Sequence, residues 1–154
     1  MAAEIRLARS VDTQTLARMR YDWTVEDGLG LVRERDDFER AFVETVARGL
    51  ADGRWRIWVA EEDGAIVSHV FVGLIEKVPR PTRDARWIGY VTNVYTRPEH
   101  RGRGVGTLVL EAVQAWAADE GVELLFVWPS DESVSFYESA GFSSGRDPLV
   151  WEPE

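Results

Sequence analysis

The feature that most restricts the fold is a glycine-rich stretch, Arg101-Gly102-Arg103-Gly104-Val105-Gly106, which follows a strand-like run and leads directly into a helical pattern. Glycine lets the backbone approach a ligand closely, and a helix N-terminus presents amides without intrahelical acceptors and a positive partial charge. The stretch therefore predicts a strand–loop–helix unit whose loop binds an anion, with a diphosphate as its natural ligand. A plain glycine-rich turn is the alternative.

Two familiar phosphate-binding loops do not match this stretch. The dinucleotide-binding fingerprint needs a third glycine at the position that Thr107 occupies here. The phosphate loop of nucleotide hydrolases needs a lysine followed by serine or threonine, and the stretch contains no lysine. Both nucleotide-binding interpretations therefore fail on spacing.

Hydrophobic periodicity predicts the elements around this unit. Strand patterns cover residues 5–8, 54–61, 65–76, 87–96, 122–128 and 148–151, and helical patterns cover about 12–23, 36–50, 105–120 and 130–140. Asp63-Gly64 is a hairpin signal, and residues 77–86, with two prolines and four basic residues, predict a loop. The order predicts one α/β domain of the mixed α+β kind over residues 1–154, with a mostly antiparallel central sheet of about six to seven strands flanked by about four helices.

Composition excludes several classes of function. The 154 residues include no cysteine, which excludes thiol catalysis and thiolate-bound zinc, and two histidines, His69 and His100, are too few for most metal sites, so no metal is expected. A net charge of −9 disfavours nucleic acid as a partner. No apolar run approaches the roughly 20 residues of a membrane span, and the N-terminal residues lack a signal-peptide pattern. We therefore expect a cytoplasmic protein with no membrane partner.

Beyond these patterns, the chain resembles the GCN5-related N-acetyltransferases (GNAT), which move an acetyl group from acetyl-CoA to an amine. The family signature Q/R-x-x-G-x-G/A is matched by residues 101–106, and residues 94–100 resemble the strand and short loop that precede it. A second family block, ending in F-Y-E-x-x-G-F, is matched by residues 130–142. The predicted element order agrees with the family across nearly the whole chain.

The resemblance implies acetyl-CoA as the acyl donor and assigns roles to particular residues. The residues expected to bind it are Val94, Tyr95, Thr96, Arg101, Gly102, Arg103, Gly104, Val105, Gly106, Thr107, Ser130, Phe136 and Tyr137. Backbone groups of 94–96 would pair with the pantetheine arm and polarise the thioester carbonyl, and Tyr137 would give a proton to the departing thiolate. Ser130 stands where many relatives carry an asparagine, which weakens that expected contact. The alternative for Tyr137 is a half-buried aromatic on an amphipathic helix.

A general base and the acceptor are less clearly marked. Histone-type relatives carry a glutamate on the fourth strand where this chain has Tyr90, a poor base because tyrosine ionises near about pH 10. Tyr90 is instead expected on the acceptor side, where it would position a water. His69 titrates in a useful range, but a strand histidine is more often structural. Tyr21, Trp23 and Glu26 form an acidic and aromatic segment that suits a cationic amine, with a solvated acidic loop as the alternative, whereas the basic loop 77–86 favours an acidic substrate.

The sequence therefore predicts an acetyl-CoA-dependent N-acetyltransferase that acts on a primary amine of a small molecule or peptide. Without cysteine, transfer is expected to be direct, within a ternary complex. The alternatives are a non-catalytic acyl-CoA-binding or sensor domain, and an acyltransferase with another acyl donor or a hydroxyl acceptor.

Trp58, Trp87 and Trp128 are expected in the core, and an exposed Trp151 would be compatible with a homodimer.

Overall fold

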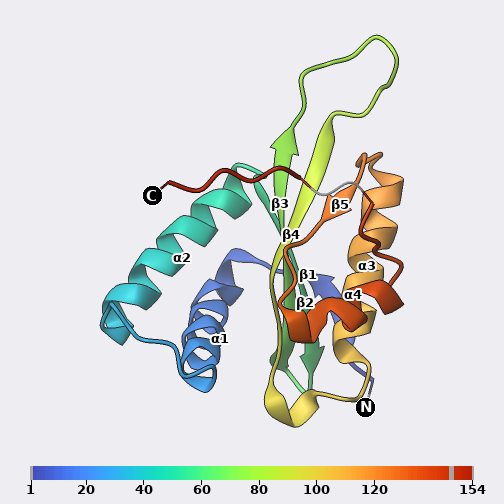
Figure 1. The fold of residues 1–154 in the computed structure, drawn as a ribbon. Helices are drawn as coiled ribbons and strands as arrows, with labels where there is room; N and C mark the ends of the chain where they lie inside the picture. Colours follow the sequence, from blue (N-terminus) through green and yellow to red (C-terminus); the bar gives the residue numbers. More distant parts are fainter. Residues whose placement is uncertain (1, 146–147, 154) are drawn as a thin grey trace.

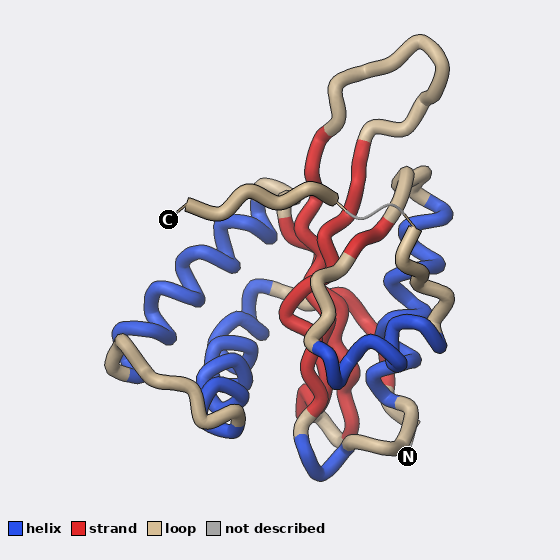
Figure 2. Tube along the Cα trace, viewed as in Figure 1, coloured by secondary structure: helices blue, strands red, loops and turns tan. Residues whose placement is uncertain are grey.

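A single mixed sheet forms the centre of the computed structural model, which describes residues 2–145 and 148–153 (Figures 1 and 2). Within that part of the chain the strands are β1 (Glu4–Leu7), β2 (Trp55–Glu62), β3 (Ala65–Glu76), β4 (Trp87–Thr96) and β5 (Leu125–Phe126), in the spatial order β1-β2-β3-β4-β5. Neighbours are antiparallel except for the parallel pair of β4 and β5. The mixed fold is as the sequence predicts.

The helices cover both faces of the sheet. Helices α1 (Thr13–Glu26) and α2 (Arg35–Ala51) lie on one face, and α3 (Val105–Asp119) and α4 (Val134–Ser139) lie on the other (Figure 1). We call these the α1/α2 side and the α3/α4 side. None of the helices in the described residues is long and apolar enough to cross a membrane.

Each side has its own hydrophobic core. On the α3/α4 side, mostly aliphatic side chains pack together, among them Val70, Val72, Val91, Val109 and Val113. The core on the α1/α2 side is more mixed, and its buried members are Leu16, Met19, Val46, Ile57, Val59, Ile66, Phe71 and Tyr95. Side chains of β2 and β3 alternate between the two cores, except at the register shift where Ala60 pairs with Ser68 and Glu61 pairs with Ile66.

One extra residue interrupts the alternation in β4. The pairing with β3 shifts from Phe71↔Thr92 to His69↔Tyr95, so that Asn93 and Val94 together oppose Val70. Asn93 has φ 50°, in the left-handed region that asparagine tolerates better than most residues. Because of this bulge, Val91 and Tyr95 face opposite sides although they lie four positions apart. The bulge also bends the strand where its pairing with β5 has ended, since β5 pairs only with Gly89 and Tyr90.

Most predicted elements are confirmed, including the limits 87–96 of β4 and the hairpin turn, where Asp63 (φ 50°) and Gly64 (φ 78°) are both left-handed. Three expectations were wrong. The described residues form five strands rather than six to seven, and the predicted strand 122–128 is ordered as β5 only at Leu125–Phe126. Residues 148–151 pair with no strand in the part of the chain described, and the Trp151 side chain is exposed.

The shortness of β5 has a physical reason. An apolar run becomes a strand only where an edge is available to pair with it, and the bulge at Asn93 turns β4 away from the chain beyond Phe126. Pro129 then removes a backbone donor. As a result Trp128, expected in the core, is 58% exposed, whereas Trp58 is buried and Trp87 is partly buried.

Candidate active site

The glycine-rich stretch forms an open cradle at the start of α3. Gly102 (φ 72°) and Gly104 (φ 77°) are both left-handed, and a Cβ added at either would meet nothing within 4 Å. The first amides of α3 have no intrahelical acceptor, and its N-cap residue, Gly104, has no side-chain oxygen that could accept from them. These amides and the positive end of the helix make a site for an anion built from backbone groups.

Gly106 brings three elements together at the inner wall of this cradle. A Cβ added there would lie 3.3 Å from Oγ1 of Thr96, at the end of β4, and 3.7 Å from the ring of Phe136 on α4. The Thr96 hydroxyl is itself fixed by a 2.8 Å hydrogen bond with the Ser68 hydroxyl on β3. A side chain at position 106 would therefore crowd the junction of β4, α3 and α4.

Tyr137 lies on α4, next to this wall. Its side chain is buried in the core of the α3/α4 side, with ring centroids 5.1 Å from Phe136 and 5.6 Å from Phe142. Burial, with a smaller contribution from the Tyr90 phenol, raises the pKa of Tyr137 to about 12. Tyr137 is therefore a protonated phenol at neutral pH and can donate a proton.

Three aromatic rings meet where β4 and β5 pair. Tyr90 stacks on Phe126 at 5.2 Å, and the ring of Trp128 stands edge-on to both at 5.2 Å. Sequence reasoning identified Tyr90 but missed its two partners. The signal was present in the two-residue spacing of 126 and 128, which places their side chains on one face of an extended segment.

A stacked column attaches α1 to the end of β4. Trp23 stacks on Tyr95 with 5.3 Å between centroids, and Arg20 lies 4.5 Å above Trp23. The Tyr95 hydroxyl donates to Glu26 at 3.0 Å, and Glu26 also forms an ion pair with Arg101. Trp23 and Glu26, expected on the acceptor side, therefore contact two residues expected at the cofactor.

This contact fixes the charges in the column. Hydrogen bonding from the Arg101 guanidinium lowers the pKa of Glu26, and the same contact raises the pKa of Arg101. Burial, with the hydrogen bond to Glu26, raises the pKa of Tyr95 to about 12. Glu26 is thus ionised at neutral pH and partly neutralises an arginine of the glycine-rich stretch.

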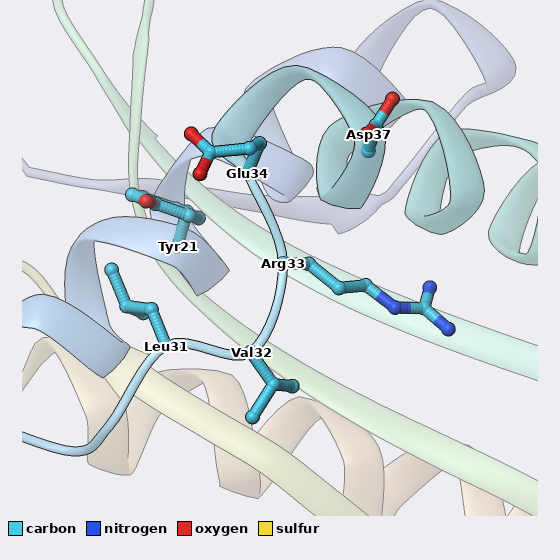
Figure 3. Close-up of a pocket in the computed structure, with 6 residues that line it drawn as sticks. All are labelled: Tyr21, Leu31, Val32, Arg33, Glu34 and Asp37. Atoms are coloured by element: carbon cyan, nitrogen blue, oxygen red, sulfur yellow. The ribbon is translucent and has the colours of Figure 1, made fainter.

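Tyr21 lies apart from these residues. Its ring centroid is 5.8 Å from that of Phe38, and the Arg35 guanidinium lies over the ring, 4.8 Å from the centroid, in a cation–π contact. It borders an open hollow of about 540 Å³ formed with the connection between α1 and α2, where Leu31 lies near it and the Arg33 side chain points away (Figure 3). The residues predicted for the acceptor, Tyr21, Trp23, Glu26 and Tyr90, are therefore divided among three places.

The remaining predicted residues differ in what their side chains do. The Val94 and Val105 side chains pack into the core of the α3/α4 side, so only their backbone groups are available to a ligand. Thr107 is exposed in the first turn of α3, and the exposed Ser130 hydroxyl donates to that of Ser133 at 3.0 Å. Arg103 pairs with Glu62 at 3.2 Å.

Two sets of polar side chains are held by carboxylates of this chain. His100 lies 2.9 Å from Glu62 with its side chain 21% exposed. In the basic loop, Glu123 accepts hydrogen bonds from Lys77 and from Arg80, and lies 3.6 Å from Arg83. Most of the positive charge of loop 77–86 therefore surrounds one carboxylate of this chain.

His69 holds the bulge of β4. It is fully buried, its Nδ1–H donates to the Asn93 carbonyl at 2.7 Å, and burial lowers its pKa to about 4. Its Nε2 and the Nδ2 of Asn93 have no hydrogen-bond partner among the described residues. A neutral imidazole out of contact with solvent positions the backbone here and is badly placed to take a proton from an acceptor.

Comparisons with known proteins agree with this geometry. A family model described as an acetyltransferase (GNAT) domain matches residues 53–144, more than half of the chain. The aminoglycoside N(6')-acetyltransferase type 1 of Stenotrophomonas maltophilia is 31% identical over 121 residues, which are 78% of this chain and 71% of that protein. The mycothiol acetyltransferase of Nocardiopsis dassonvillei is 29% identical over 102 residues, covering 66% of this chain and 28% of that protein.

Solved structures share the fold over nearly the whole chain. A predicted acetyltransferase from Clostridium acetobutylicum, solved with acetyl-CoA, superposes with a TM-score of 0.81 at 23% identity, over 97% of this chain and 96% of that one. A GCN5-related N-acetyltransferase from Ralstonia eutropha JMP134 superposes with a TM-score of 0.77 at 26% identity, over 99% and 98% of the two chains. The family match and the shared fold establish that this chain belongs to the GCN5-related N-acetyltransferase family of enzymes.

Proposed function

We propose that the chain transfers an acetyl group from acetyl-CoA to the primary amine of a small molecule or peptide. One observation carries the proposal: the anion cradle at the start of α3 meets, through Gly106 and Phe136, the helix that carries the buried and protonated Tyr137. An anion site beside a proton donor is what transfer from a phosphate-containing thioester requires.

The residues present fit acetyl-CoA. The open space outside Gly102 and Gly104 leaves room for a diphosphate, which the first amides of α3 would hold. The 94–96 segment of β4, bent by the bulge beyond its pairing with β5, would bind the pantetheine arm through its backbone groups. When bound, acetyl-CoA supplies an acyl group activated as a thioester.

The chain's own residues then assist in two ways. A backbone amide in 94–96 would stabilise negative charge on the carbonyl oxygen, as in an oxyanion hole. Tyr137 keeps its proton into strongly alkaline solution and would give it to the departing sulfur, and the proton that the amine nitrogen loses would restore the phenol. Because the sequence has no cysteine, direct transfer within a ternary complex is favoured over a cysteinyl acyl-enzyme.

The relatives support an amine as the acceptor. The Stenotrophomonas maltophilia relative is named an aminoglycoside N(6')-acetyltransferase, and a relative from Trypanosoma brucei brucei, 30% identical over 64 residues, is named a glucosamine 6-phosphate N-acetyltransferase. Both names specify transfer to nitrogen. A nitrogen acceptor is therefore the simplest proposal for this chain too.

Calorimetric titration with acetyl-CoA tests the proposal. The native chain should bind it saturably, and Gly104→Glu should weaken binding by about 100-fold or more, because a carboxylate in the cradle repels the diphosphate. The matched control is Gly28→Glu, since Gly28 (φ 67°) is also left-handed with open space around it but lies beyond the end of α1. Equal binding by native chain and Gly104→Glu would place the ligand elsewhere, and no binding to the native chain would refute the proposal.

A further inference from the structure

A second hollow, which we call the α2 pocket, lies between α2 and the sheet. Its volume is about 330 Å³, within the roughly 300 to 1,000 Å³ of small-molecule sites. Phe38 and Phe42 of α2 form one wall, Trp55 and Phe71 of β2 and β3 form another, and Thr92–Asn93 of β4 borders it. None of these residues was assigned to a site from the sequence.

The walls of the α2 pocket are aromatic and fixed in place. Phe42 lies 6.2 Å from Phe71 between ring centroids, and Trp55 lies 6.0 Å from Phe71, both edge-on. Two glycines make room for the Trp55 indole. A Cβ added at Gly73 would lie 3.2 Å from the indole, and a Cβ added at Gly49 on α2 would overlap it. The pocket is therefore largely formed before a ligand arrives.

The charge of the residues that line the α2 pocket disfavours polycations as ligands. Among the described residues that line the α2 pocket there is no carboxylate, and the charged one is Arg33, a cation. A ligand with several ammonium groups would lose hydration there without gaining a partner. An apolar or aromatic group would instead replace water against aromatic surface.

The position of the pocket connects it to the proposed reaction. Thr92 and Asn93 come directly before the 94–96 segment, whose backbone would face the thioester, and they lie on the α1/α2 side, opposite the cradle. A molecule held in the α2 pocket therefore lies next to the strand at which transfer would take place, without competing for the cradle. This step rests on the proposed function.

We infer that the α2 pocket binds the apolar end of the acceptor, and that the acceptor class is a primary amine with an aromatic or branched alkyl group and no second positive charge. The amine reaches past Thr92 towards the 94–96 segment, while the apolar group fills the space between α2 and the sheet. The same geometry makes polyamines and aminoglycosides poor acceptors for this chain.

The first test measures binding and does not depend on turnover. 2-Phenylethylamine is titrated calorimetrically into the native chain and into Thr45→Trp, which fills the pocket from an exposed position on α2. We expect binding to weaken by about tenfold or more in Thr45→Trp and to be unchanged in Glu44→Trp, whose side chain points to solvent on the same helix. Ala41→Leu fills the same pocket more gently if Thr45→Trp does not fold.

The second test measures turnover as release of the CoA thiol, which is free of background from a chain without cysteine. We expect kcat/KM for 2-phenylethylamine to exceed that for spermidine or kanamycin by about tenfold or more. We also expect Thr45→Trp to lower the value for 2-phenylethylamine by a larger factor than the value for ethylamine, and Glu44→Trp to leave both unchanged. A preference for polycations, or an equal loss for both monoamines, would overturn the inference.

The two failures are distinguishable. If acetyl-CoA neither binds nor releases thiol, the proposed function fails, and binding of 2-phenylethylamine still decides the nature of the α2 pocket. If acetyl-CoA turns over but the native chain does not bind 2-phenylethylamine, or binds it as well in Thr45→Trp, the inference fails and the proposed function stands.

Discussion

The two sides of the sheet are built for different kinds of recognition. On the α3/α4 side, the candidate site consists of backbone amides at Gly102–Gly106 and one buried phenol, Tyr137, over an aliphatic core. On the α1/α2 side, the candidate acceptor pocket consists of side chains, most of them aromatic. A backbone site can stay the same while many side chains change, whereas a side-chain pocket changes its ligand with a single substitution. The difference teaches that, under the proposed function, the α3/α4 side would supply the chemistry and the α1/α2 side would select the acceptor.

The largest effect that separates the two sides is expected from Tyr137→Phe. Loss of the donated proton should lower kcat by about 100- to 1,000-fold, with the affinity for acetyl-CoA and for the amine unchanged. Steady-state thiol release gives kcat, and calorimetry gives the affinities.

Tyr21→Phe is the matched control, because Tyr21 lies on the α1/α2 side beside Phe38. Full activity in Tyr137→Phe would remove the proton donor from the proposed mechanism, and an equal loss in Tyr21→Phe would mean that the comparison between the sides is mistaken.

The second prediction concerns the His69–Asn93 hydrogen bond, which holds the bulge of β4. Burial lowers the pKa of His69 to about 4. Between about pH 6.5 and pH 4 this imidazole is therefore protonated in the unfolded chain but stays neutral in the folded chain. The free energy of unfolding should therefore fall by about 3 kcal/mol from this group as the pH drops through that window. Urea unfolding at a series of pH values measures it.

His69→Asn keeps an amide donor near the Asn93 carbonyl but cannot titrate, so this part of the acid slope should disappear. In His100→Asn, where His69 is intact, the slope should remain. An unchanged slope in His69→Asn would show that another group causes the loss of stability in acid.

A third prediction uses the buried tyrosine on each side. Burial raises the pKa of both Tyr137 and Tyr95 to about 12, so the folded chain resists ionisation that the unfolded chain undergoes near about pH 10. The stability that these phenols contribute is complete below about pH 10 and is lost as the pH rises towards 12, by about 2 kcal/mol for Tyr137.

Absorbance titration of the phenolates and urea unfolding between these pH values check it. Tyr137 and Tyr95 should titrate late, and Tyr137→Phe and Tyr95→Phe should each remove one late-titrating phenol. A single late tyrosine that persists in Tyr137→Phe would mean that the phenol on the α3/α4 side is not buried.

The smallest effect should come from Glu26→Gln, which removes the ion pair between the end of α1 and the glycine-rich stretch. Glu26 pairs with Arg101, and without that carboxylate the guanidinium is free to attract the diphosphate. Acetyl-CoA should bind about two- to fivefold more tightly at low ionic strength, and the gain should shrink as salt is added. Glu44→Gln, an exposed carboxylate on α2, should change nothing; weaker binding in Glu26→Gln would show that the column is needed to shape the cradle.

Local sequence patterns indicated the glycine-rich loop but not the α2 pocket. The glycine spacing at 102, 104 and 106, and the positive φ angles of Asp63-Gly64, are local requirements of the backbone, so a single segment is enough to reveal them. The α2 pocket depends on Phe42, Trp55, Phe71 and Thr92, which come from four elements and meet only in the folded chain. In the sequence Phe38 and Phe42 form part of an ordinary apolar stripe of a helix.

The errors in strand prediction have the same origin. Residues 122–128 and 148–151 carry strand-like apolar runs, but pairing is a property of the neighbouring edge and not of the run itself. The bulge at Asn93 was not visible in advance, since asparagine inside a strand has no unique meaning. It nevertheless determines how far β5 can follow β4 and why Trp128 is exposed.

The bulge also determines which changes in length β4 can accept. Asn93 is the extra residue opposite Val70, so its deletion would leave Val91 on the α3/α4 side and Tyr95 on the α1/α2 side, and would remove only the bend. Loss of any one of residues 88–92, with the bulge retained, would turn the side chains before it towards the wrong core. An alignment with a homologue whose β4 is one residue shorter should therefore place its gap at position 93. Deletion of Asn93 would remove the bend and leave both cores in place.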